Sequence, residues 1–148
     1  MSDLRELYQE SVVDHARNPR NFGKLEGANR KADGYNPLCG DRITVYARVE
    51  EDVIRQTSFD GYACGICTAS GSLMGEAVKD KSLVQAEILF EAFHNLVTQG
   101  TVAGTTPMGG LTVLSEVKKF SLRVKCATLP WDTLRAALGQ SNDEPSAP

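Results

Sequence analysis

The chain has 148 residues, of which 41% are hydrophobic and 24% are charged, as expected for one globular domain with a single core. A net charge of −3 offers no general attraction to phosphate backbones or anionic lipid, so neither nucleic acid nor membrane is an expected partner. The charged N-terminal segment is unlike a secretion signal, and no apolar run of about 18 residues follows it. We therefore expect a cytoplasmic protein. Its four cysteines favour metal or catalytic roles over disulfides, because that compartment keeps thiols reduced.

The first part of the chain predicts a helix, an irregular connection and a hairpin. Apolar residues recur at three- and four-residue steps over residues 4–15, which predicts an amphipathic helix that ends before Asn18. Residues 20–37 are rich in Gly, Asn and Pro, as in an irregular connection. Alternation over residues 43–50 predicts a strand, and residues 53–59 predict its antiparallel partner after an acidic turn.

The middle of the chain predicts mainly helices. Residues 68–79 have helix-compatible apolar spacing, and Ser82 is a plausible N-cap for a helix that runs to about Thr98. Residues 100–110 are rich in Gly, Thr and Pro and predict a loop, followed by a brief helical piece near 111–117.

The C-terminal part predicts one more helix and a tail. This helix is expected to start after Cys126 and to end at Gly139. Residues 1–140 then form the domain, and residues 141–148 form a flexible tail. Few strands and several helices predict an α+β fold, with a small antiparallel sheet of about three strands packed against helices.

Cys39 and Asp41 stand at the entrance to the first predicted strand, separated by Gly40. In extended backbone, residues two apart point to the same side, so the thiolate and the carboxylate project together. Zinc and iron accept both sulfur and oxygen ligands. A turn-forming aspartate beside a buried cysteine is the alternative, and this pair alone leaves both open.

Cys64 and Cys67 form a C-x-x-C pair between a predicted strand and a predicted helix, a placement shared by zinc knuckles and thioredoxin-like sites. The hairpin before the pair opposes the βαβ context that the redox interpretation needs. A zinc ribbon is excluded, because Cys39 and Cys126 stand alone. What remains is a site of separated ligands that the fold brings together. Cys126 is expected at the start of the last helix, where the partial positive charge favours thiolate.

Three thiolates and a carboxylate around a divalent metal leave a formal charge of about −2. Arg42, Arg123 and Lys125 each lie within three residues of a proposed ligand and can offset that charge. The alternative for all three is a solvated surface charge.

Four other side chains have simpler interpretations. Cys67 is interpreted as a buried small hydrophobe near the site, with a reserve thiol or alternative ligand as the second possibility. His15 is interpreted as a structural hydrogen-bonding group of the first helix rather than a metal ligand, and His94 as exposed. Trp131 is expected to anchor the core.

Several spaced blocks together resemble the U-type iron-sulfur scaffold family, which includes IscU, SufU and the NifU N-terminal domain, over nearly the whole chain. The blocks are Asp14-His15 with Asn18–Gly23, Asn36–Asp41, Cys64–Ser70 and Arg123–Trp131. The scaffold branch of this family has a histidine directly before its third cysteine and a shorter connection to it. Here that position is Lys125, and an extra segment covers residues 100–117, as in the SufU branch. Cys67 departs from the small hydroxyl residue common in the family.

The resemblance implies a SufE/NifU-like fold and a zinc-dependent, sulfurtransferase-like acceptor rather than a conventional turnover enzyme. The implied Zn²⁺ ligands are Cys39, Asp41, Cys64 and Cys126. The implied sulfur acceptor is Cys39, with Arg123 and Lys125 in supporting or partner-facing roles. The implied partners are a pyridoxal-phosphate-dependent, SufS-like cysteine desulfurase and downstream iron-sulfur assembly proteins. One alternative is a scaffold that uses iron at the same ligands to assemble a [2Fe-2S] cluster and transfer it to apo-proteins, and another is a structural zinc domain.

Overall fold

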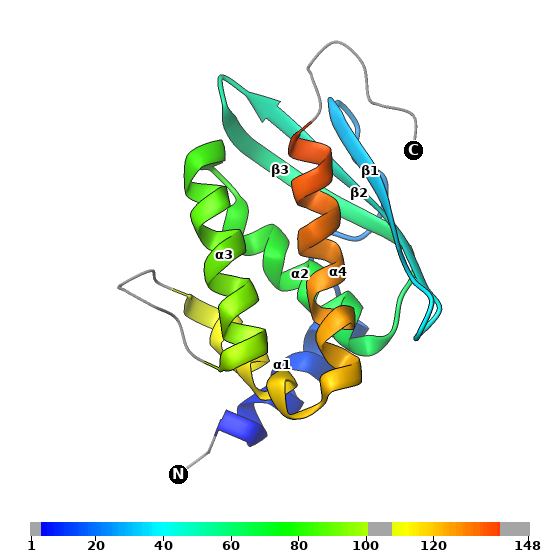
Figure 1. Cartoon of the computed structure of the whole chain (residues 1–148). Helices are drawn as coiled ribbons and strands as arrows, with labels where there is room; N and C mark the ends of the chain where they lie inside the picture. Colours follow the sequence, from blue (N-terminus) through cyan, green and yellow to red (C-terminus); the bar gives the residue numbers. More distant parts are fainter. Residues whose placement is uncertain (1–3, 101–107, 140–148) are drawn as a thin grey trace.

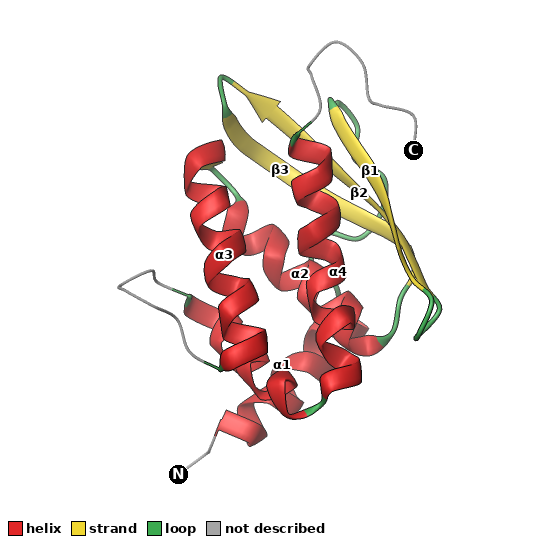
Figure 2. Ribbon diagram, in the orientation of Figure 1, coloured by secondary structure: helices red, strands yellow, loops and turns green. Residues whose placement is uncertain are grey.

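The computed structural model describes residues 4–100 and 108–139, in which helices pack on a four-stranded antiparallel sheet (Figure 1; Figure 2). In chain order the elements are α1 (Leu4–Arg17), β1 (Arg30–Asn36), β2 (Asp41–Glu50), β3 (Val53–Tyr62), α2 (Gly65–Val78), β4 (Lys81–Ser82), α3 (Leu83–Gln99), the 3₁₀ helix η1 (Gly109–Lys119) and α4 (Ser121–Leu138). The strands lie in the order β1-β2-β3-β4. The predicted α+β class is confirmed.

The central hairpin of β2 and β3 agrees with its prediction. Its turn residues Glu51 and Asp52 have φ angles of 52° and 61°, as required by a two-residue turn whose twist matches that of the strands. β3 continues to Tyr62, beyond its predicted end at Phe59. This extension carries the chain to the end of the sheet at which Cys64 lies.

Two strands were not predicted. β1 lies within residues 20–37, so the prediction of an irregular connection there is wrong. Its buried end residues, Arg30 and Asn36, are polar, and the strand exists because all seven of its residues pair with β2. The two-residue β4, at Lys81–Ser82, is the fourth strand where about three were expected. In both cases the pairing partner determines the strand rather than a local pattern.

The start of α3 follows the predicted cap. The Ser82 hydroxyl oxygen accepts the Gln85 N–H at 3.1 Å, and the Gln85 side chain accepts the Ser82 N–H at 2.9 Å, a capping box. The brief helix expected near residues 111–117 corresponds to η1. Most of the predicted loop, residues 101–107, and the predicted tail lie outside the described residues.

The last helix begins earlier than predicted. α4 starts at Ser121, directly after a turn at Phe120 that ends η1, and Cys126 is its sixth residue. The expected start after Cys126 is therefore wrong. The helix also continues through Pro130, which lacks the N–H that would bond to the carbonyl of Cys126.

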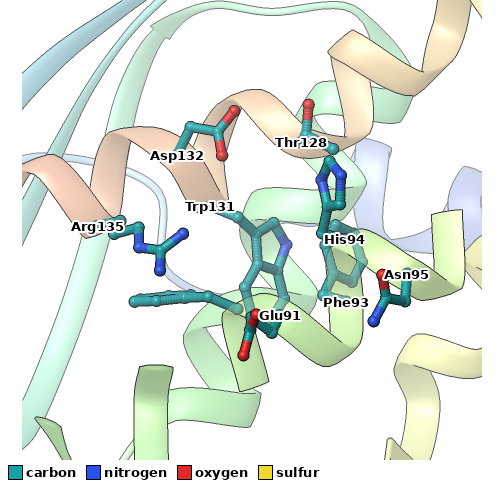
Figure 3. A pocket seen from close by; sticks show the side chains of 9 residues that line it. Glu91, Phe93, His94, Asn95, Thr128, Trp131, Asp132 and Arg135 are labelled. Carbon is teal, nitrogen blue, oxygen red and sulfur yellow. The ribbon is translucent and has the colours of Figure 1, made fainter. Parts of the chain in front are cut away.

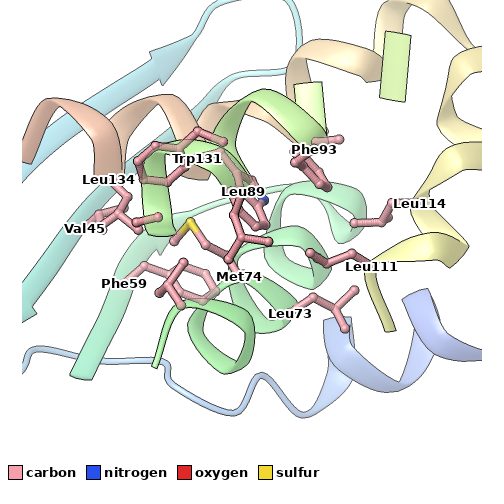
Figure 4. Close-up of a cluster of buried hydrophobic side chains, with 14 of the residues drawn as sticks. Val45, Phe59, Leu73, Met74, Leu89, Phe93, Leu111, Leu114, Trp131 and Leu134 are labelled. Atoms are coloured by element: carbon pink, nitrogen blue, oxygen red, sulfur yellow. The ribbon is translucent and has the colours of Figure 1, made fainter. Parts of the chain in front are cut away.

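The core lies between the inner face of the sheet and the helices (Figure 4). Side chains that meet there include Val45, Phe59, Met74, Leu89, Phe93, Leu114, Trp131 and Leu134. Trp131 is 2% exposed, its ring stacks on Phe93 at 4.3 Å, and its indole N–H donates to Ser70 at 3.1 Å. Its predicted role as a core anchor is confirmed.

His15 joins α1 to α2. Its Nδ1 lies 2.7 Å from the Ser72 hydroxyl oxygen, which also accepts the backbone N–H of Arg20 at 3.0 Å. Burial lowers the pKa of His15, so the ring is neutral at neutral pH. The structural interpretation of His15 is confirmed, and His94 is exposed as predicted. None of the helices in the described ranges is long and apolar enough to span a membrane.

Candidate metal centre

Three ligand-type side chains converge where the β1–β2 hairpin meets α4. Cys39 lies in the hairpin loop, Asp41 is the first residue of β2, and Cys126 lies in α4. One ligand atom of each lies within 4.8 Å of the other two. The two sulfurs are 3.0 Å apart, whereas about 3.8 Å separates sulfurs in a tetrahedral site with Zn–S bonds of about 2.3 Å. The two sulfurs would therefore need to move apart by less than about 1 Å for these side chains to bind one tetrahedral metal ion.

Cys64 lies beside the Asp41 carboxylate. Its sulfur is 3.9 Å from Asp41 Oδ2, and its backbone N–H donates to Asp41 Oδ1 at 2.8 Å. Cys64 is not in the mutually close group of three, but a separation of 3.9 Å is near the distance between two ligands of one tetrahedral ion. Asp41 is 1% exposed and has a ligand-type oxygen close to the predicted thiol ligands Cys39, Cys64 and Cys126.

Cys126 does not lie at the start of the last helix, where the sequence predicted it. The side chain is 0% exposed inside α4, and burial, followed by hydrogen bonding with Cys39 and Cys64, raises the pKa of its thiol. The thiol at a helix N-terminus is that of Cys64, the N-cap of α2, whose sulfur accepts the Cys67 N–H at 3.4 Å. The prediction therefore assigned the helix-terminus environment to the wrong cysteine.

Cys67 is 0% exposed in the hydrophobic core, and desolvation raises the pKa of its thiol. Its interpretation as a small buried hydrophobe agrees with this environment.

Arg123 is the predicted cation that contacts the thiols. Its Nη1 lies 3.4 Å from the Cys39 sulfur and 4.0 Å from the Cys126 sulfur. Its side chain is exposed, and the pKa of its guanidinium is raised by hydrogen bonding to Cys126 and by the nearby thiol charges. Arg123 therefore places a positive charge beside the more exposed sulfur.

The other two predicted cations point elsewhere. Lys125 is exposed, and its charge acts on Asp132 of α4. The guanidinium of Arg42 lies 4.6 Å from the centroid of the Tyr35 ring, one strand position away from the buried Asp41. Arg42 and Lys125 both match the alternative of a surface charge.

One residue of the site, Asn36, was missed by sequence reasoning. Asn36, 3% exposed, donates from Nδ2 to Asp41 Oδ2 at 3.3 Å and to the Cys126 sulfur at 3.6 Å. An isolated Asn carries no sequence signal for such a role.

Gly34 allows α4 to approach β1 near this centre. A Cβ at Gly34 would overlap Thr133 Oγ1 and lie 3.1 Å from Leu129 Cδ1, both on α4. We expect Gly34→Ala to push α4 away from the hairpin and to weaken metal binding about tenfold, because Cys126 moves with the helix. Titration of the purified variant against a chromophoric chelator measures this.

The control for Gly34→Ala is Gly110→Ala, whose added Cβ would make only an ordinary contact, at 3.5 Å from Leu73. Zinc affinity equal to the wild type in Gly34→Ala would show that the close approach of α4 does not hold the centre together.

A separate cavity of about 310 Å³ lies between α3 and α4 (Figure 3). Its lining includes Phe93 and Trp131 together with the polar side chains of Glu91, His94 and Asp132. None of the four predicted ligands, all of which are described, lines this cavity, so it is distinct from the thiol centre.

Fold and site together define a small α+β domain whose cysteines and aspartate can hold a metal ion. The NifU-like N terminal domain family matches residues 7–140, and the chain belongs to this family. The family-level resemblance seen in the sequence motifs is confirmed.

Relatives from both branches of the family are similar to the chain. The zinc-dependent sulfurtransferase SufU of Bacillus subtilis is 33% identical over 139 residues, 94% of each chain. The iron-sulfur cluster assembly scaffold protein IscU of Streptococcus pyogenes is 36% identical over 141 residues, 95% of this chain and 88% of the relative. The crystal structure of a putative iron-sulfur cluster assembly scaffold protein for the SUF system of Fervidobacterium islandicum has a TM-score of 0.82 at 32% identity, covering 89% of this chain and 96% of that one. The identities do not separate the branches.

Proposed function

We propose that this protein accepts sulfur from a pyridoxal-phosphate-dependent cysteine desulfurase, as a zinc-dependent step within the role in iron-sulfur cluster assembly that its family gives it. The observation that carries the proposal is the unequal access to the clustered thiols. Cys126 is fully buried, whereas Cys39 and Cys64 are both partly exposed. Cys64 is held as the N-cap of α2 with its N–H bonded to Asp41, but Cys39 lies on a hairpin loop. A protein-borne sulfur donor can therefore reach Cys39.

The transfer is an exchange between two sulfur atoms. The Cys39 thiolate attacks the outer sulfur of the donor persulfide, a new S–S bond forms on Cys39, and the old S–S bond breaks. Its electron pair leaves with the donor thiolate, so the exchange needs no external oxidant or reductant. Arg123, 3.4 Å from the Cys39 sulfur, stabilises the attacking anion.

Asp41, Cys64 and Cys126 are the residues that would hold zinc throughout, with Cys39 as the exchangeable fourth ligand. Bound zinc supplies ionised thiols at neutral pH, where a free thiol with a pKa of about 8.5 is mostly protonated. Because coordination also reduces the nucleophilicity of a thiolate, the reacting sulfur must be the one that can leave. The loop position of Cys39 suits that role.

A cluster scaffold is the second candidate, because the same donors accept iron and the IscU relative is as similar as the SufU relative. In this function a [2Fe-2S] cluster is the cargo, assembled on the thiols and passed to apo-proteins. Colour separates the candidates, since a cluster-loaded protein purified without oxygen is brown and a zinc protein is colourless.

The deciding experiment combines metal analysis of the purified protein with a sulfur-transfer assay. We expect about one zinc per chain, faster sulfide production by a SufS-like desulfurase supplied with L-cysteine, and a persulfide mapped to Cys39 by mass spectrometry. A chain that retains zinc but shows neither stimulation nor label would be a structural zinc domain. Iron and sulfide in equal amounts would favour the scaffold.

A further inference from the structure

Asn36 is a buried polar side chain that contacts two proposed ligands of the thiol centre, Asp41 of β2 and Cys126 of α4. It is the last residue of β1, directly opposite Asp41 in the pairing with β2. Its two amide hydrogens can serve two acceptors, and Nδ2 lies 3.3 Å from Asp41 Oδ2 and 3.6 Å from the Cys126 sulfur. One side chain therefore contacts two proposed ligands that lie on different elements.

The remaining polar atom of Asn36 fixes the loop that carries Cys39. Its Oδ1 accepts the backbone N–H of Leu38 at 3.2 Å, which identifies the oxygen end of the amide and directs both N–H groups toward the centre. The donor and acceptor ends of Asn36 are thus both used.

The thiols of Cys39 and Cys126 differ in their burial and in their contacts. Cys126 is fully buried and receives an N–H from Asn36, whereas Cys39 is partly exposed and is contacted by Arg123 from its exposed side. An N–H···S hydrogen bond from a buried donor stabilises a thiolate ligand, and burial keeps Cys126 out of reach of a protein-borne sulfur donor. Both effects favour Cys126 as a permanent ligand.

We propose that Asn36 is a positioning residue that keeps Asp41 and Cys126 as fixed ligands and so makes Cys39 the thiol that accepts sulfur. The selection of Cys39 rests on the proposed function, whereas the effect of Asn36 on metal binding does not. Asn36 takes no part in the S–S exchange itself, in which the outer sulfur passes from the donor persulfide to a thiolate of this chain.

The test compares Asn36→Ala and Asn36→Ser in the full chain with the wild type. Serine retains a hydroxyl that can accept the Leu38 N–H and so keep the loop turn, but it is too short to serve Asp41 and Cys126. We expect zinc affinity, measured by chelator competition, to fall about 10- to 100-fold in both variants. After reaction with desulfurase and L-cysteine, peptide mapping should show persulfide on Cys126 as well as Cys39.

The matched control is Asn29→Ala. Asn29 also holds the sheet through its amide, with bonds of 2.8 Å and 2.7 Å to the backbone of Val49, but it lies away from the thiols. Its loss should lower stability without changing zinc affinity or the labelled cysteine. Wild-type zinc affinity and labelling of Cys39 alone in both Asn36 variants would overturn the proposal.

The two proposals fail in different ways. If the wild type itself takes no sulfur on any cysteine, the proposed function fails, and weakened zinc binding in the Asn36 variants still supports the positioning role. If the wild type is labelled on Cys39 and the variants match it in both measurements, the positioning role alone is wrong.

Discussion

Replacing Cys39 by serine is expected to abolish sulfur acceptance, with persulfide on the chain falling by roughly 100-fold or more. A serine hydroxyl does not ionise at neutral pH. Of the other two thiols of the proposed centre, Cys126 is fully buried, and Cys64, although partly exposed, is proposed to stay bound to the metal. Because Cys39 is partly exposed on a loop, the metal-free variant should melt within a few degrees of the metal-free wild type. Mass spectrometry of the chain after incubation with desulfurase and L-cysteine measures the loss.

The control for Cys39→Ser is Cys67→Ser, the same chemical change at a thiol that is buried in the core. Burying a hydroxyl there costs about 1–3 kcal/mol of stability but should leave both zinc content and the persulfide on Cys39 intact. Substantial zinc loss in Cys67→Ser would mean that Cys67, rather than Cys64, is a ligand. Full sulfur acceptance by Cys39→Ser would refute the acceptor assignment.

Removal of the metal should give the largest change in stability. The proposed ligands join the β1–β2 hairpin, the N-terminus of α2 and the interior of α4, so a bound ion cross-links distant parts of the fold. An ion present at 1,000 times its dissociation constant stabilises the native state by about 4 kcal/mol. At about 2–4 °C per kcal/mol, a strong chelator should lower the melting temperature by roughly 8–16 °C.

Cys126→Ser provides the comparison for the chelator experiment. This variant should melt at a lower temperature from the outset and respond little to the chelator, because the fully buried ligand of α4 is missing. An unchanged melting temperature of the wild type after verified removal of zinc would contradict an intact four-ligand site.

Elements with strong local patterns were predictable from the sequence. The apolar spacing of α1, the alternation of β2 and the capping residue Ser82 each describe interactions within a few residues. β1 was not predictable, since its polar sequence becomes a strand only through pairing with β2. The start of α4 was missed for a related reason, because η1 leads into it almost without interruption and leaves no clear boundary.

The ligand-type residues of the centre were predictable from the sequence, but the burial of Cys126 and the contacts of Asn36 were not. The prediction that the Cys39 and Asp41 side chains project together agrees with the structure, which brings both to Cys126. The predicted reason, extended backbone, is wrong, because Cys39 and Gly40 lie in the hairpin turn, where Gly40 has a φ of 74°. The burial of Cys126 depends on where α4 begins, so its surroundings were predicted wrongly. Asn36 was missed because an amide is an ordinary loop residue until both of its acceptors are known.

Cys126 follows Cys39 by 87 positions, and this separation affects when the metal centre can form during synthesis on the ribosome. While α4 is still inside the exit tunnel, Cys39, Asp41 and Cys64 have already emerged. The sulfur of Cys126, which completes the proposed centre, is still in the tunnel with α4. The final helix must emerge and pack on β1 and β2 before an ion can be fully enclosed. Translation order thus delays stable metal capture until α4 has been synthesised and has left the tunnel.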